Sequence, residues 1–198
     1  IRISSFDSTR REIARLALEK LIKDGRIQPL KIEQVVAQTK TEMDKILFSE
    51  GKKICQEVGA FNLPMDLTKE IGKYKFRFSY GQNLAKHTIE ATKIAIGIAH
   101  ELKANVNIVR LGALFHDIGK IAIPDAILLK QSLLSEDEWR IMQNHPEIGY
   151  TFLCNHPLMS VPSEIVRSHH ERYDGSGYPR HLKKDEICLG ARLFAIID

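Results

Sequence analysis

His116 and Asp117 are adjacent in the chain and together offer an imidazole and a carboxylate to a metal ion. Because a carboxylate has two oxygens, Asp117 is able to bridge two ions while His116 binds one of them. Other histidines also lie in apolar stretches, where a buried ring needs a polar partner. These are His87, His145, His169 and His170, and the carboxylate of Asp198 has a similar setting. The pattern indicates a metal centre assembled from separate parts of the chain.

A pair of divalent metal ions would satisfy these side chains together, because converging histidines would otherwise leave several ring nitrogens without partners. Histidine and carboxylate ligands without cysteine suit iron, manganese or zinc. They suit magnesium less well, since it prefers oxygen ligands. Two ions lower the pKa of a shared water molecule and clamp the oxygens of an in-line displacement at phosphorus. We therefore predict hydrolysis of a phosphate ester. The remaining histidines are not interpreted as ligands.

Two neighbouring features are candidates for catalysis and substrate binding. Lys120 follows His116 by one helical turn, where its ammonium could contact a phosphate oxygen; the alternative is an ordinary surface lysine. Residues 174–179 form a glycine-rich loop directly after His169 and His170, and glycines permit close approach of the backbone to a ligand. We predict that this loop forms one wall of the pocket, through Gly177, Tyr178 and Pro179.

Apolar residues at helical spacing predict the elements that position these side chains. Helices are expected from residue 7 to 24, through about residue 58, over 84–102 and over 107–117, with a connection at 59–72. In the third of these, one stripe is expected to turn His87 toward the core; it contains Leu84, His87, Ala91, Ile94, Ala95, Ile98 and Leu102. Ser135 and Glu138 fit a capping box. The fold class predicted is an all-α, multi-helix bundle with an N-terminal helical extension.

Composition bounds the class of protein. A chain of 198 residues with 43% hydrophobic content can bury a core, and its apolar runs fall well short of the roughly 20 residues of a membrane span. Three widely spaced cysteines favour a reducing cytoplasm. Residues 1–86 carry 17 Lys and Arg against 11 Asp and Glu, so this half is basic. Because the chain begins at Ile1 and ends directly after an apolar run, we expect it to be a piece of a longer polypeptide.

The second half of the chain, over residues 111–198, resembles the HD superfamily of metal-dependent phosphohydrolases, specifically its HD-GYP branch. The resemblance is carried by four ordered motifs, at residues 116–125, 145–149, 169–179 and 190–198. It implies a helical domain over 79–198 and hydrolysis of cyclic di-GMP at a metal-bridged hydroxide. The metal ligands implied are His87, His116, Asp117, His145, His169, His170 and Asp198, with Asp117 bridging and Lys120 assisting catalysis. Because Asn83 stands where three-metal members have Glu, two metal ions are expected.

The first half, over about residues 1–120, resembles ribonuclease Y, a family of bacterial endoribonucleases with an HD domain. The similarity is strongest at Phe78-Ser79-Tyr80-Gly81-Gln82-Asn83. It implies that residues 1–78 correspond to the segment between the KH and HD domains of that family. The KH G-x-x-G loop and the membrane anchor of ribonuclease Y are not in this sequence, so any membrane tether would come from segments outside it.

Three functions compete. Cyclic di-GMP hydrolysis is the main prediction, because the motifs downstream of Lys120 are of the HD-GYP type. Ribonuclease Y-like cleavage of single-stranded RNA is the alternative, supported by the basic first half. A catalytically inactive nucleotide-sensing module is the third. The partners expected are a cyclic dinucleotide, RNA as an alternative, and a second copy of the chain, without direct insertion into a membrane.

Overall fold

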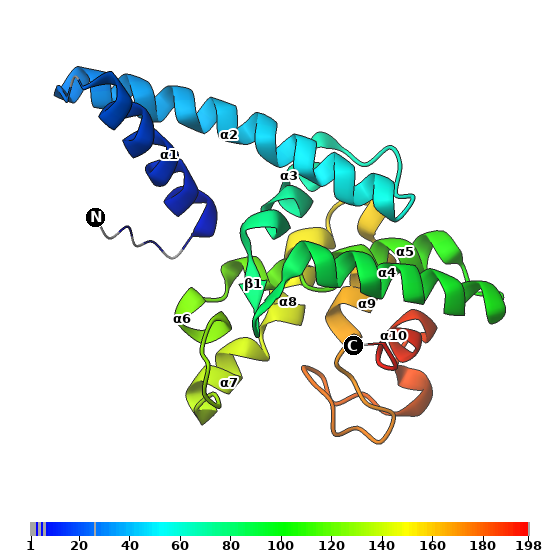
Figure 1. The fold of residues 1–198 in the computed structure, drawn as a ribbon. Coiled ribbons are helices and arrows are strands. Elements are labelled where there is room, and N and C mark those ends of the chain that lie inside the picture. The colour runs from blue at the N-terminus through cyan, green and yellow to red at the C-terminus, as the bar shows by residue number, and fades with distance from the viewer. Residues whose placement is uncertain (1–2, 4, 6, 26, 198) are drawn as a thin grey trace.

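The computed structural model describes residues 3, 5, 7–25 and 27–197, and this part of the chain is almost entirely helical (Figure 1). The predicted all-α class is confirmed. The α-helices, 3₁₀ helices (η) and strands are α1 (Ser8–Asp24), α2 (Pro29–Glu57), α3 (Met65–Gly72), η1 (Lys73–Phe76), β1 (Phe78–Ser79), β2 (Gln82–Asn83), α4 (Leu84–Glu101), α5 (Val106–Phe115), η2 (Ile118–Ala122), α6 (Asp125–Leu128), α7 (Glu136–Met142), α8 (His145–Leu153), η3 (Pro157–Met159), α9 (Pro162–Ser168), η4 (Lys184–Glu186) and α10 (Leu189–Phe194).

Helices α1 and α2 form a hairpin at one end of the molecule (Figure 1). α1 begins where the Asp7 carboxylate accepts the backbone N–H of Thr9 at 2.8 Å, and it ends at Gly25, whose φ is 74°. Pro29 lies in the first turn of α2, where a missing N–H costs no hydrogen bond. The sequence therefore predicted both ends of α1 correctly. An apolar cluster between the two helices includes Ala17, Leu21 and Val35.

Helix α3 packs on α2 through two glycines. A Cβ on Gly51 would lie 1.8 Å from the backbone oxygen of Thr68, and a Cβ on Gly72 would lie 1.9 Å from that of Leu47. The two backbones touch directly, which a larger residue would prevent. The predicted connection at 59–72 is therefore wrong in its second half. With only 8 residues, α3 is too short for its apolar periodicity to stand out in the sequence.

Helices α4 and α5 lie side by side and carry much of the candidate site (Figure 1). The predicted stripe on α4 is only partly correct, because Ile94 and Leu102 are exposed, by 53% and 56%. Ala91 and Ala95 of the predicted stripe are buried, and other small residues complete the buried face, since they allow α5 to approach closely; these are Thr88, Thr92 and Ala99. A Cβ on Gly112 of α5 would lie 2.7 Å from the side chain of Ile165 on α9, so these two helices meet in a tight contact.

A further glycine contact sets η2 against the first turn of α8. A Cβ on Gly119 would lie 1.9 Å from the backbone oxygen of His145 and 2.9 Å from the nitrogen of Gly149. Because Asp117 and Lys120 lie within two residues of Gly119, this contact brings both of them near His145.

The ends of the remaining elements follow local signals. The Ser135 hydroxyl accepts the N–H of Glu138, whose carboxylate accepts the N–H of Ser135, so the predicted capping box opens α7. The last apolar stretch of the chain is helical as far as Phe194, where α10 ends. None of the helices in the described part of the chain combines the length and the apolar character that a membrane span requires. The division into domains at residues 78 and 79 stays a prediction.

Candidate metal centre

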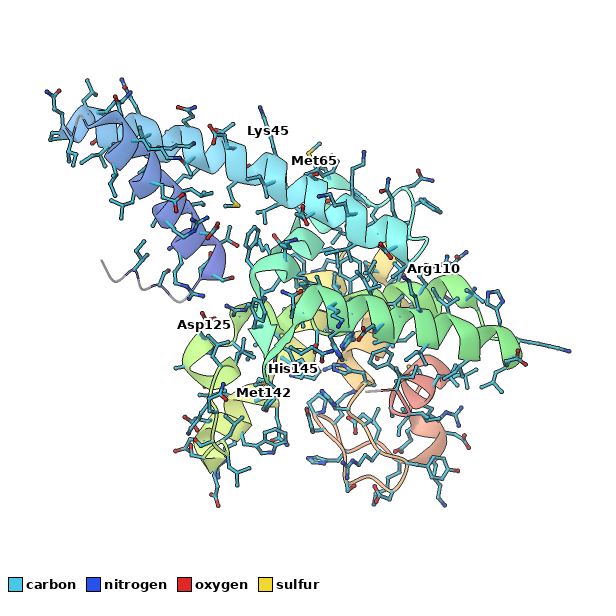
Figure 2. The ribbon with its side chains drawn as sticks, in the orientation of Figure 1. Lys45, Met65, Arg110, Asp125, Met142 and His145 are labelled. Carbon is cyan, nitrogen blue, oxygen red and sulfur yellow. The ribbon has the colours of Figure 1, made fainter. Side chains whose placement is uncertain are left out.

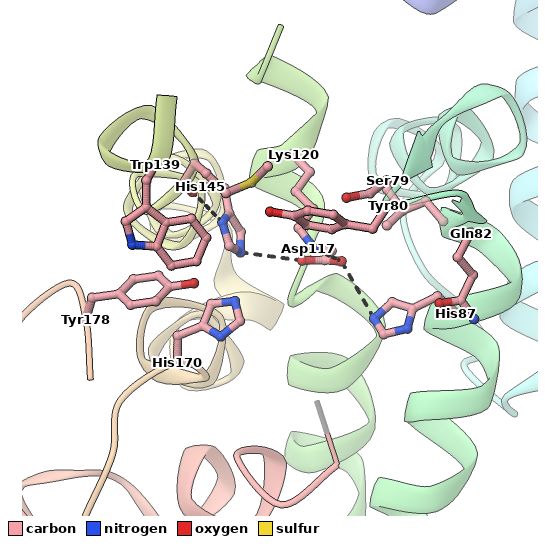
Figure 3. Close-up of a pocket in the computed structure, with 12 residues that line it drawn as sticks. Ser79, Tyr80, Gln82, His87, Asp117, Lys120, Trp139, His145, His170 and Tyr178 are labelled. Carbon is pink, nitrogen blue, oxygen red and sulfur yellow. Dashed lines mark hydrogen bonds and ion pairs between the residues drawn. The ribbon is translucent and has the colours of Figure 1, made fainter. Parts of the chain in front are cut away.

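Asp117 lies at the middle of the candidate centre, directly after the end of α5. Both His116 and Asp117 are fully buried. Figure 3 shows the Asp117 carboxylate between His87 on one side and His145 on the other, with dashed lines to both rings. The side chains come from α4, from the end of α5 and from α8, so packing of three separate helices positions them.

One set of potential ligands, the Asp117 group, consists of His87, His116 and Asp117. Nε2 of His87 lies 3.1 Å from Nε2 of His116. Oδ2 of Asp117 lies 3.2 Å from Nε2 of His116 and 3.8 Å from Nε2 of His87. The ligand atoms of this group lie within 4.8 Å of one another, which is close enough for one metal ion to contact all three.

A second set, the His145 group, consists of His145, His169 and His170. Nε2 of His145 lies 3.2 Å from Nε2 of His169, and His170 packs against both rings. Oδ1 of Asp117 lies 3.5 Å from Nε2 of His145. The two oxygens of Asp117 therefore face different groups, Oδ2 the Asp117 group and Oδ1 the His145 group.

Backbone hydrogen bonds determine which ring nitrogen is available in three of these histidines. Nδ1 donates to the carbonyl oxygen three residues earlier in His116, His145 and His169, at 2.7, 2.8 and 2.7 Å. A carbonyl oxygen only accepts, so Nδ1 carries the proton and a neutral ring presents its lone pair at Nε2. The Nε2 atoms of His145 and His169 then face each other with two lone pairs, an arrangement that a cation stabilises.

Burial lowers the pKa of His145 to about 3, so its ring is neutral near neutral pH. For Asp117, burial alone would raise the pKa, but the neighbouring groups, the Lys120 ammonium among them, outweigh burial and hold the pKa well below its usual range. Nζ of Lys120 donates to Oδ2 at 2.8 Å. Among the described residues, buried Oδ1 of Asp117 has no hydrogen-bond partner. Neutral ring nitrogens and an ionised carboxylate oxygen without a donor are what a metal pair requires, so the residues present fit it.

Arg77 fixes the backbone that carries Lys120. Its guanidinium donates to the backbone oxygens of residues 120, 121 and 123, at 3.0, 2.7 and 2.6 Å, and pairs with Asp125 at 2.5 Å. Asp125 also pairs with Arg11, and Figure 2 shows Asp125 near the start of α1. Arg77 is only 2% exposed. Arg77 therefore holds the site segment in place, and Asp125 joins that segment to the N-terminal helix.

The centre opens into a pocket of about 260 Å³. Besides candidate ligands and Lys120, its lining includes Ser79, Tyr80, Gln82, Trp139, Met142 and Tyr178. Ser79, Tyr80 and Gln82 come from the β1–β2 hairpin, in which Phe78 pairs with Asn83 and Ser79 with Gln82. Tyr80 and Gly81 form the turn with φ of 49° and 80°, the left-handed region typical of tight hairpin turns.

The predicted loop contributes one pocket residue of the three proposed. The ring of Tyr178 lines the pocket and stacks on His170 with centroids 4.7 Å apart. Gly177 has a packing role, because a Cβ there would lie 2.3 Å from the backbone nitrogen of Arg172. Neither Gly177 nor Pro179 is among the lining residues, and their part in substrate binding stays a prediction. Asp198, a predicted ligand, lies outside the described residues.

Several functional residues were missed in the sequence. Arg77, Ser79 and Gln82 belong to the segment resembling ribonuclease Y, which was the signal that could have pointed to them. Glu171 is 1% exposed, and its carboxylate accepts the backbone N–H groups of Arg180 and Leu182 at 2.7 and 3.0 Å. It therefore holds the loop that follows Tyr178. Its position after two histidines and before a glycine-rich loop gave no indication of this role.

Comparison with known proteins identifies the family. The model of the HD domain matches residues 84–198. The chain belongs to the HD domain family. This match covers the region from the first turn of α4 to the end of the chain, and it includes every ligand candidate.

Curated relatives of this HD domain protein are ribonuclease Y proteins. That of Symbiobacterium thermophilum is 40% identical over 154 residues, which are 78% of this chain and 30% of the relative. That of Enterococcus faecalis is 40% identical over 168 residues, or 85% of this chain and 30% of the relative. That of Chloroflexus aurantiacus is 48% identical over 156 residues, or 79% and 30%. The chain thus spans about 30% of the length of these relatives. Family and relatives together point to a metal-dependent hydrolase.

The main prediction, hydrolysis of cyclic di-GMP, is corrected by these findings. The relatives are named ribonuclease Y, and a match of 168 residues must extend well past Lys120, so the resemblance is not confined to the first half. The motif at 123–125 had favoured the HD-GYP branch. Asp125 has a structural explanation instead, because it is the ion-pair partner of buried Arg77.

Proposed function

We propose that this chain is the catalytic core of a ribonuclease Y-like endoribonuclease that cleaves single-stranded RNA. The observation that carries the proposal is the position of Asp117, whose two oxygens face two separate ligand groups beside Lys120 at the pocket. The names of the relatives support RNA as the substrate. The chain spans about 30% of the length of those relatives. We extend the proposal to the activity of the whole protein.

The Asp117 group would hold one divalent ion and the His145 group a second, with the oxygens of Asp117 between them. When bound, such a pair lowers the pKa of a water molecule and offsets negative charge on a phosphodiester. Iron, manganese and zinc match the imidazole-rich donor set better than magnesium does.

The first contribution of the protein itself is a positive charge held at the pocket wall. Asp117 holds the Lys120 ammonium at the pocket wall, where only 11% of the lysine side chain is exposed. A cation fixed beside the scissile phosphate stabilises the negative charge that develops on its oxygens during cleavage. Since Arg77 fixes the backbone oxygen of Lys120, the ammonium is positioned before substrate arrives.

The β1–β2 hairpin supplies polar groups for recognition. Ser79, Tyr80 and Gln82 offer two hydroxyls and an amide to the pocket. The buried hydroxyl of Ser79 has no hydrogen-bond partner among the described residues. These groups match the ribose and phosphate oxygens of RNA, whose 2′-hydroxyl both donates and accepts.

The loop at 174–179 adds a finer assignment. Tyr178 forms one wall of the same pocket through its stacking on His170. We propose on this basis that Tyr178 contacts the RNA substrate at the metal pocket.

The test is cleavage of end-labelled single-stranded RNA by the full chain, loaded with manganese, iron or zinc. Wild-type protein is expected to produce metal-dependent fragments and to leave cyclic di-GMP intact. Asp117→Asn and Lys120→Met should lose cleavage by at least about 100-fold, whereas Lys86→Met, a control with 73% of its side chain exposed, should retain it. RNA that stays intact with every metal would refute the proposal and favour the sensing module.

A further inference from the structure

A second cavity adjoins the metal pocket and shares two aromatic residues with it. It has a volume of about 720 Å³, compared with about 260 Å³ for the metal pocket. Tyr80 and Trp139 line both, and residues 130–134, between α6 and α7, complete the second. The metal pocket, at about 260 Å³, is small even for a compact ligand. A polynucleotide that is cut there must therefore continue beyond this pocket.

Aromatic rings form a row from the metal ligands toward the second cavity. Tyr178 stacks on His170 at an interplanar angle of 28°, and Trp139 meets Tyr178 edge-to-face with centroids 6.1 Å apart. Figure 3 shows Trp139 and Tyr178 together on one side of Asp117, with Tyr80 extending from the hairpin. The row leads from the candidate site of cleavage to the boundary between the two cavities.

Tyr80 and Trp139 both expose a large part of their side chains to solvent. Tyr80 is 60% exposed and Trp139 is 43% exposed. Tyr80 also has a φ of 49°, a left-handed conformation that is unfavourable for a bulky residue. Its backbone N–H donates to the oxygen of Leu128 at 3.1 Å, which fixes the hairpin on α6 while leaving the ring exposed. Burial therefore does not explain the large ring at this position.

We propose that Tyr80 and Trp139 stack the unpaired bases that flank the scissile phosphate, and that the strand continues along the second cavity. The inference rests on the proposed function, and it specifies the substrate as a single strand of several nucleotides. Exposed aromatic faces bind unpaired bases of any sequence, whereas bases within a duplex are not accessible to them. Leu133, 94% exposed in the second cavity, adds an apolar surface for the same strand.

Trp139 is the only tryptophan in the chain, so its fluorescence reports on this surface directly. The full chain is titrated with octaadenylate, with a diadenylate, and with an octamer of abasic sugar-phosphate, and recovery of intact oligonucleotide is verified afterwards. Octaadenylate is expected to quench the emission saturably and to bind more tightly than the other two. Equal quenching and affinity for the abasic octamer would overturn the inference, because that ligand has no bases to stack.

Variants separate stacking from folding. Trp139→Ala and Tyr80→Ala are each expected to raise the Kd for octaadenylate by about 5- to 150-fold, the range for loss of one stacked base. Trp139→Phe should retain most of the affinity. Phe152→Ala is the matched control, since Phe152 is 52% exposed on α8 and lines neither cavity. Circular dichroism verifies the helix content of each variant.

The outcomes distinguish this inference from the proposed function. RNA cleavage without quenching of Trp139 would overturn the stacking surface alone. Quenching and base-dependent binding without cleavage under any metal would support the surface and refute the nuclease. A Kd unchanged in both alanine variants would overturn the inference even if RNA binds elsewhere.

Discussion

Replacement of Arg77 by Met is expected to destabilise the fold more than any exposed charge deletion. The guanidinium donates to three backbone oxygens and to the carboxylate of Asp125, all in a setting where Arg77 is 2% exposed. Burial lowers the pKa of Arg77, and the charge of Asp125 opposes that shift. Methionine fills a similar volume but leaves these acceptors without a donor.

The magnitude follows from the partners that remain. Breaking a buried ion pair costs about 3–5 kcal/mol, and each backbone oxygen left without a donor adds about 1 kcal/mol. Asp125 keeps its pairing with Arg11, and its side chain is 18% exposed, which reduces the first contribution. We therefore expect Arg77→Met to lower the free energy of unfolding by about 3–5 kcal/mol. Arg77→Lys should lose about half as much, because it keeps the charge but cannot span all four acceptors.

Urea unfolding followed by circular dichroism measures this loss, with an unchanged m value required for the comparison. Arg192→Met is the control, because Arg192 pairs with the 87% exposed side chain of Asp185 and should cost below about 1 kcal/mol. If Arg77→Met is within 1 kcal/mol of wild type, the guanidinium is not what joins the site segment to the rest of the fold.

Three further changes have defined outcomes. Gly119→Ala should destabilise by about 1–3 kcal/mol or more and weaken metal binding in parallel, because its Cβ would lie 1.9 Å from the backbone oxygen of His145; thermal unfolding and metal titration measure the two effects, and normal metal affinity would contradict the geometry. Tyr74→Phe should leave stability unchanged or raise it by about 1 kcal/mol, because the buried hydroxyl has no hydrogen-bond partner among the described residues; a loss above that in urea unfolding would show that it has one. Glu171→Gln should speed hydrogen exchange at the amides that follow Tyr178, since an amide side chain cannot accept from both N–H groups as the carboxylate does; unchanged protection there would refute the role given to Glu171.

Local sequence signals accounted for most of the helices and for the burial of His116 and Asp117. His116 and Asp117 follow an apolar helix with small residues on its contact face, and this pattern specified both burial and position. The capping box at Ser135 and the glycine stop of α1 likewise depend on residues only a few positions apart. Such features are predictable because the interactions that produce them are local.

Long-range contacts were not predictable in the same way. The pairing of Arg77 with Asp125 joins residues 48 positions apart, and an arginine in a basic segment gives no sign of burial. Gly51 and Gly72 were not recognised as contact points, because a glycine has the same sequence signature in a turn and in a close helix contact. The substrate prediction failed for a related reason: the motifs after Lys120 were weighted above the resemblance that extends across most of the chain.

The central claim is that two ligand groups, joined by Asp117, each hold a metal ion. The most direct measurement is the number of metal ions per chain, determined by elemental analysis after equilibration with buffered manganese or zinc. Wild-type protein is expected to bind two, and Asp117→Ala should lose the pair while keeping its helix content. Binding of no metal by wild type, or two ions bound equally tightly by Asp117→Ala, would contradict the account.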